Sequence, residues 1–208
     1  MKQIFDRGLI RVAHPYQDPE VGSDIFKISY SGNHRNIIIE TPELFVTNLF
    51  FTMKGKVKGL EILLQRESVP PQKAPPREGD GFFHTLNAID SRVIGTVFSN
   101  YPDKMFGRTV RRTLTTGTGT STGTGTATIP QTKNTPASSS SYVRFSIPLY
   151  KNRAELLIRD ANGKICTISD IKSGMRCKCV VYLSHAEIDN KRFFLRWNLM
   201  QMNLIENK

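Results

Sequence analysis

The chain has 208 residues, with 29 Lys and Arg against 18 Asp and Glu and a pI near 9.8. This length fits one elaborated domain, and an apolar share of 38% is too high for a disordered chain. No apolar run approaches the roughly 20 residues that span a bilayer, so no membrane contact is expected. The net charge of +11 favours a polyanionic partner without choosing between DNA, RNA and an acidic lipid surface.

Cysteine usage and the start of the chain bear on localisation. Residues 1–16 lack the continuous apolar segment of a secretory signal, and three cysteines are an odd number for a disulfide framework. We therefore expect an intracellular, reducing compartment. For a viral protein this means the cytoplasm or nucleus of the host cell, with packaging in a virion as an open alternative.

The first segments of the chain predict strands. Two glycines and two prolines in residues 1–23 predict an irregular N-terminal arm with one strand around residues 9–12. Alternation predicts a hairpin of residues 24–30 and 36–40 around a Ser-Gly-Asn-His turn. The sequence Thr41-Pro42-Glu43 has the pattern of a helix cap and predicts one helical turn that leads to the next strand.

A third main strand and one helix follow. Residues 57–65 are β-branched and rich in leucine, and the lysines beside Gly55 are candidate phosphate contacts or a solvated turn: Lys54, Lys56 and Lys58. Asp80 then predicts the cap of a helix whose apolar residues recur at spacings of three and four: Phe82, Phe83, Leu86, Ile89, Val93, Ile94 and Val97. His84 and Asp90 are expected on the surface of this helix.

Two unusual segments separate the helix from the last strands. Residues 101–114 mix aromatic rings with cations and predict either an arm that follows a nucleic-acid strand or a solvated loop; its candidate contacts are Arg108, Arg111 and Arg112. Residues 115–141 are rich in Thr, Gly and Ser and carry one charge, Lys133. Such a composition cannot bury enough apolar surface to offset its ordering entropy, so a disordered insertion is expected.

The last third of the chain predicts an unbroken series of strands. Residues 142–147 alternate, residues 155–168 form a hairpin around Asn162-Gly163, and residues 173–206 form a long hairpin. The inward side chains of this long hairpin are expected to be Cys177, Cys179, Val181, Leu183, Phe193, Leu195, Trp197 and Leu199.

Cations and aromatic rings alternate on the outward face of these strands, which is the composition of a surface that holds single-stranded nucleic acid. Residues 142–208 carry a net charge of +6 in a little over half the length that gives residues 1–114 a net charge of +4. The candidate stacking rings are Tyr142, Tyr182 and Phe194. The candidate phosphate contacts are Arg144, Arg176, Lys178, Arg192 and Arg196.

The sequence contains no motif that indicates catalysis. Motifs of serine hydrolases, zinc proteases and phosphate-binding loops are missing, and the carboxylates of Asp160, Asp170 and Asp189 lie in predicted turns. Cys177 and Cys179 fall on the inward face without a second pair at zinc-ligand spacing. We expect no enzyme activity, no catalytic residue, no metal site and no cofactor.

The order of these elements predicts a fold that is mainly β. One helix between the third and fourth main strands, followed by a meander, favours an OB-fold-like small barrel with a long disordered insertion. Residues 1–208 would form a single OB-like domain, with residues 1–23 as its arm and residues 115–141 as the insertion. A β-sandwich remains an alternative.

Four segments resemble the conserved blocks of a protein family of large nucleocytoplasmic DNA viruses: NIIIETPELF (Asn36–Phe45), SYVRFSIPLY (Ser141–Tyr150), AELLIRDANGK (Ala154–Lys164) and the closing hairpin. Most of the similarity lies in an I-x-T-P-x-L block and in a W-x-x-x-Q pattern, here Trp197 and Gln201. That family is proposed to consist of OB-fold proteins that bind single-stranded DNA. The resemblance implies the same fold and ligand class for this chain.

The predicted function is non-catalytic binding of single-stranded DNA in replication, recombination or repair, in a viral setting. Replication proteins and further copies of the chain are candidate partners. A virion structural protein with a basic β-sandwich is one alternative. RNA binding is another, because contacts to a 2′-hydroxyl cannot be read from the sequence.

Overall fold

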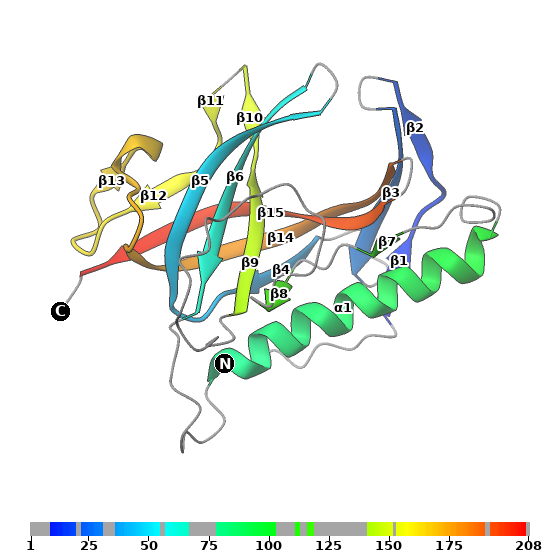
Figure 1. Ribbon diagram of the computed structural model, residues 1–208, viewed down its shortest axis with the longest axis horizontal. Helices are drawn as coiled ribbons and strands as arrows, with labels where there is room; N and C mark the ends of the chain where they lie inside the picture. The colour runs from blue at the N-terminus through cyan, green and yellow to red at the C-terminus, as the bar shows by residue number, and fades with distance from the viewer. Residues whose placement is uncertain are drawn as a thin grey trace, which may run out of the picture.

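The computed structural model describes residues 9–19, 22–30, 36–54, 57–66, 78–102, 111–112, 116–118, 141–151, 153–189 and 192–206. In chain order the elements are β1 (Ile10–Val12), β2 (Tyr16–Asp18), β3 (Ser23–Tyr30), β4 (Ile37–Glu40), β5 (Leu44–Lys54), β6 (Val57–Gln65), α1 (Glu78–Asn100), β7 (Arg111–Arg112), β8 (Thr116–Thr118), β9 (Ser141–Ile147), β10 (Leu149–Tyr150), β11 (Arg153–Ala154), β12 (Leu157–Arg159), β13 (Ile165–Cys166), the 3-10 helix η2 (Ile168–Asp170), β14 (Arg176–Asp189) and β15 (Arg192–Ile205) (Figure 1).

Five strands close into a barrel in the ring order β14, β5, β6, β9, β15 and back to β14. Ring neighbours are antiparallel except β9 and β15, which run parallel. A closed ring of five strands is the architecture of an OB barrel, and closure satisfies the hydrogen bonds that an open sheet edge would leave unpaired. The predicted mainly β, OB-fold-like barrel with one helix is therefore confirmed for the described residues.

The outer edge of β14 binds several short strands in succession. It pairs with β3, then with β4, and then with Leu44 and Phe45 at the start of β5. The predicted hairpin of residues 24–30 and 36–40 is wrong, because β3 and β4 both pair with β14 and not with each other. A strand of 14 residues offers enough edge for both segments, so long-range pairing replaces the local turn.

The predicted helical turn at residues 41–43 is also wrong. Thr41 donates its backbone N–H to the Cys179 carbonyl at 2.8 Å, and its Oγ1 accepts a hydrogen bond from the Cys179 N–H at 2.9 Å. The threonine hydroxyl thus takes the place of a backbone carbonyl in the series of hydrogen bonds along the edge of β14. Thr41-Pro42-Glu43 is therefore a short break between β4 and β5, two strands that run along the same edge of β14.

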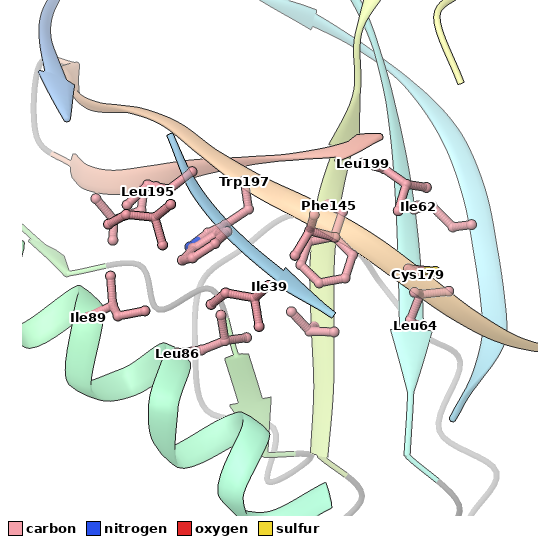
Figure 2. Close-up of a cluster of buried hydrophobic side chains, with 14 of the residues drawn as sticks. Ile39, Ile62, Leu64, Leu86, Ile89, Phe145, Cys179, Leu195, Trp197 and Leu199 are labelled. Carbon is pink, nitrogen blue, oxygen red and sulfur yellow. The ribbon is translucent and has the colours of Figure 1, made fainter. Parts of the chain in front are cut away.

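Helix α1 supplies part of the core. It lies beneath the barrel strands in Figure 1, and Figure 2 shows its Leu86 and Ile89 directed toward Ile39 and Trp197. The predicted apolar positions face this interior, since Leu86, Ile89, Val93 and Val97 are all buried. Spacings of three and four place such residues on one side of a helix, and that side covers the barrel interior.

Asp90 corrects one sequence prediction. The residue is only 2% exposed, and not on the surface as expected, whereas His84 is exposed. Asp90 lies four residues after Leu86 and three before Val93, which places it inside the apolar stripe of the helix. The polarity of its side chain suggested a surface position, but the helical period determines where it lies.

The hairpins of the last third are confirmed. β12 and β13 pair antiparallel around Asn162-Gly163, where Gly163 has a φ of 81° and Asp160 Oδ1 accepts hydrogen bonds from the N–H groups of Asn162 and Lys164. β14 and β15 pair along their whole length. Every side chain predicted to point inward on these two strands is buried. Asp189, predicted in a turn, is the last residue of β14.

The predicted arm and insertion are described only in part. Residues 10–12 form β1 as expected, and β2 and Ser23 add further paired residues within the arm. Within the predicted insertion, β8 pairs with β9, and Thr118 lies opposite Ser141. The other residues between 115 and 141 lie outside the described part of the chain, so disorder there stays a prediction. No helix among the described residues is long and apolar enough to cross a membrane.

The cysteines give a direct test of the inward face of β14. Cys177 and Cys179 are at most 2% exposed, and Cys166 is partly exposed. The hydrogen bond between the two thiols, at an Sγ–Sγ distance of 3.8 Å, and burial raise the pKa of Cys179 well above its ordinary value. A thiol-reactive reagent at pH 7.5 is therefore expected to modify Cys166 alone in the native protein and all three cysteines in urea, as measured by mass spectrometry. Modification of Cys177 or Cys179 at the rate of Cys166 would contradict the assigned face.

Candidate nucleic-acid interface

The outward sides of the five barrel strands carry a cluster of charged and aromatic side chains. The strand register aligns Phe50 of β5 with Glu61 of β6, Glu61 with Ser146 of β9, and Ser146 with Asn198 of β15. Residues two positions along these strands continue the surface because side chains alternate between the two faces. We call this surface the Arg–Phe face; its residues are Phe50, Glu61, Arg144, Glu187, Phe194 and Arg196.

Two buried carboxylates form the floor of the Arg–Phe face. Arg196 donates to Glu61 Oε1 at 2.9 Å, to Glu187 Oε2 at 3.2 Å and to the Ser146 hydroxyl at 3.2 Å. Arg144 Nη1 lies 3.5 Å from Glu61 Oε2 in an ion pair that is too long for a strong hydrogen bond. The side chains of Glu61 and Glu187 are 8% and 4% exposed, so both carboxylates lie beneath the two arginines.

Each arginine of this face also lies over an aromatic ring. The guanidinium carbon of Arg196 is 4.9 Å from the centre of the Phe194 ring, and that of Arg144 is 5.2 Å from the centre of the Phe50 ring. Such distances allow cation–π attraction. Arg144, with 48% of its side chain exposed, and Arg196, with 25%, are therefore held in fixed orientations while part of each remains open to solvent.

The predicted phosphate contacts on β14 lie far from this face. Arg176 is paired with Ile205, and Lys178 with Asn203, seven positions along β15 from Arg196. Seven residues of a strand span roughly 23 Å. Arg176 forms an ion pair with Glu43, whereas exposed Lys178 forms none in the described part of the chain. The β12–β15–β14 register places exposed Arg159 in the same row as Asn203 and Lys178.

Two predicted stacking rings have different surroundings. Tyr182 lies on β14 between Lys178 and the Arg–Phe face. It is opposite Asn198, whose Nδ2 donates a hydrogen bond to the tyrosine oxygen at 2.9 Å. Tyr142 of β9 is 37% exposed and is two residues from Arg144 on the same face of its strand. Both rings are outward, and Tyr182 is the more enclosed of the two.

The remaining predicted contacts are described incompletely. Lys56 and Arg108 lie outside the described residues. The parallel pairing of β7 with β15 brings the backbone of Arg111 opposite Arg192 and that of Arg112 opposite Phe193. Segments some 80 residues apart in sequence thus meet at one end of β15. The predicted contacts described only by their backbone are Lys54, Lys58, Arg111, Arg112 and Arg192.

Sequence reasoning missed three parts of this surface. Phe50 lies on β5, a strand that was not predicted although the run LFVTNLFFTMK is rich in β-forming residues. Glu61 and Glu187 gave no signal, because single carboxylates in strands are ordinarily solvated. Their contacts with arginine depend on a register that only the folded barrel defines.

Among the described residues, no group of three or more His, Cys, Asp or Glu side chains could hold a metal ion. The arrangement described above can bind a flat ring through its phenyl and guanidinium groups, and an anion through exposed cations such as Lys178. Its chemical groups are guanidinium, carboxylate, hydroxyl, amide and phenyl.

Comparisons with known proteins give structural likenesses at low identity. No family model matches the chain, and no curated protein sequence matches it. The structure is similar to the crystal structure of gp2.5, a single-stranded DNA binding protein encoded by bacteriophage T7, at 12% identity and a TM-score of 0.45 over 84% of this chain and 88% of that one. It is also similar to a C-terminally truncated single-stranded DNA-binding protein from bacteriophage Enc34, at 10% identity and a TM-score of 0.49 over 95% of this chain and 96% of that one. The resemblance to the family of nucleocytoplasmic DNA viruses stays a prediction.

Proposed function

We propose that the protein binds single-stranded DNA without catalysing a reaction on it, and that it acts in viral DNA replication, recombination or repair. One observation carries the proposal: two arginines lie over two phenylalanine rings on the outward side of adjacent barrel strands, and both contact the same carboxylate, that of Glu61. Bases of a single strand are accessible to stacking, whereas the bases of a duplex are covered by their neighbours.

In the proposed binding mode, aromatic rings contact the bases and cations contact the phosphates. Phe50 and Phe194 stack bases on the Arg–Phe face, and Tyr142 stacks a base beside it. Exposed cations outside it, Lys178 and Arg159 among them, contact phosphates and release counterions. A net charge of +11 supports this mode, because it attracts a polyanion over distances longer than any single contact.

Fluorescence anisotropy with labelled 30-mers tests this function. The expected result is tighter binding to a single-stranded DNA 30-mer than to its duplex at both 50 and 200 mM salt, with an affinity that falls as salt rises. Equal affinity for the single strand and the duplex at both salt concentrations would contradict the proposal. A single-stranded RNA 30-mer of the same sequence is the third arm, and preference for it would replace DNA by RNA as the ligand.

Replication proteins and further copies of the chain remain proposed partners, and an intracellular, reducing compartment remains the proposed location. A pull-down from infected or expressing cells after nuclease treatment identifies protein partners that do not depend on bound DNA.

A further inference from the structure

The buried carboxylates of Glu61 and Glu187 offset the positive charge of the arginines on the Arg–Phe face, an effect that the proposed function does not itself require. Arg144 and Arg196 carry two positive charges, and Glu61 and Glu187 carry two negative charges directly beneath them. Ion pairs removed from water interact more strongly than pairs at an open surface, because the surrounding dielectric is lower. The four groups therefore form an electrically balanced cluster within a strongly basic protein.

This balance determines what the cluster attracts. A phosphate that approaches either guanidinium also approaches a carboxylate, so the attraction that a free arginine would exert is largely cancelled. Binding through phosphates requires cations whose charge is not already compensated. Lys178, which forms no ion pair among the described residues, meets that requirement, whereas Arg144 and Arg196 do not.

The same contacts fix the orientation of the arginines. Arg196 is held by Glu61, Glu187 and the Ser146 hydroxyl while its guanidinium lies over the Phe194 ring. Arg144 is held by Glu61 over the Phe50 ring. A guanidinium that is fixed beside a phenyl ring presents a planar surface that suits the face of a nucleobase.

We propose that Glu61 and Glu187 are specificity-determining residues, which cancel the charge of Arg144 and Arg196 so that the Arg–Phe face binds exposed bases and does not bind the phosphates of a duplex. This inference rests on the proposed function, since it assigns a cause to the preference for single strands. A duplex offers phosphates but no exposed base faces, and so it gains little from a neutral stacking surface. The two glutamates act through the arginines as positioning residues.

The test compares Glu61→Gln and Glu187→Gln with Glu155→Gln. Glu155 is exposed and its side chain takes no part in the cluster, so its variant controls for the loss of one negative charge. Each cluster variant releases about one positive charge, which adds about 0.9 to the salt slope for duplex and raises duplex affinity roughly tenfold at 50 mM salt. Affinity for the single strand is not expected to rise in proportion, because the released arginine no longer lies over its ring.

Titrations of single-stranded and duplex 30-mers over 50–200 mM salt provide the readout. The expected result is a reduced ratio of single-strand to duplex affinity in both cluster variants, with Glu155→Gln within about twofold of the parent protein. If the parent prefers single strands and the cluster variants behave like Glu155→Gln, the inference is overturned while the proposed function stands. If the parent shows no such preference, both fail.

Arg144→Gln gives a second test that does not disturb a buried carboxylate, because nearly half of this side chain is exposed and Glu61 keeps Arg196. The variant removes a guanidinium from the stacking surface, so affinity for the single strand should fall. The salt slope should stay the same, because the charge of Arg144 is compensated by Glu61. Lys178→Gln should instead lower the slope by about 0.7, as expected for one lost phosphate contact. A loss of about 0.7 in the slope of Arg144→Gln would overturn the inference even if both glutamine variants failed to fold.

Discussion

The double variant Phe50→Ala, Phe194→Ala is expected to bind an oligo-dT 30-mer at least about 30-fold more weakly than the parent protein. Each ring that stacks a base contributes roughly 1–3 kcal/mol, and two rings at the lower figure give that factor. Oligo-dT is the probe because it forms little structure of its own. Anisotropy titration at a fixed 100 mM salt measures the loss, and the salt slope should change little because no charge is removed.

The matched control for this variant is Phe98→Ala. Phe98 is 46% exposed on α1 and takes no part in the Arg–Phe face, so its removal should leave affinity unchanged. Far-UV circular dichroism checks that all three proteins keep their β structure. Parent-like affinity in a folded double variant would exclude the Arg–Phe face from base contact, and an equal loss in Phe98→Ala would show that the effect does not depend on the position of the ring.

The second large effect is expected in stability. Trp197 is 1% exposed and lies between the barrel strands and α1, on the side where Ile39 and the helix residues Leu86 and Ile89 are found (Figure 2). Trp197→Ala should lower the free energy of unfolding by about 3–5 kcal/mol, through lost transfer energy and the cavity left behind. Equilibrium unfolding in urea, followed by circular dichroism, measures the difference.

Two further substitutions sharpen this prediction. Met200 lies on the same strand with 44% of its surface exposed, so Met200→Ala should change the free energy of unfolding by less than about 0.5 kcal/mol. Trp197 Nε1 is buried without a hydrogen-bond partner among the described residues, so Trp197→Phe removes an unsatisfied donor along with some volume. Trp197→Phe should therefore lower the free energy of unfolding by less than Trp197→Ala does. An alanine variant as stable as the parent would show that Trp197 does not fill the core.

The inward faces of the barrel elements could be predicted wherever they follow from the residue pattern within a single strand or helix. The alternation of Cys177, Cys179, Val181 and Leu183 identifies the inward face of β14, and the spacing of Leu86, Ile89, Val93 and Val97 identifies that of α1. Both are properties of a local period. The pairing of β3 and β4 with β14, over sequence separations of about 140 to 164 residues, has no local signature and was predicted wrongly.

The candidate interface was predictable only in part, for the same reason. The outward rings and cations of β9, β14 and β15 follow from alternation, so Arg144, Phe194 and Arg196 could be named from the sequence. That the two arginines are neutralised could not be read, because Glu61 is 135 residues from Arg196 in the chain and meets it only when β6, β9 and β15 are adjacent. The sequence therefore suggested phosphate contacts for Arg144 and Arg196 without any sign of the ion pairs that the structure shows between them and buried glutamates.

The most direct test of the account is the position of photochemical crosslinks between the native protein and an oligo-dT 30-mer. Irradiation at 254 nm joins thymine to side chains in contact with it, and mass spectrometry after trypsin digestion locates the joined peptides. We predict crosslinks in the peptide of residues 193–196, which contains Phe194, and in the peptide that contains Phe50. Crosslinks confined to peptides of Tyr16, Phe98 or Tyr150, exposed rings outside the Arg–Phe face, would contradict the account.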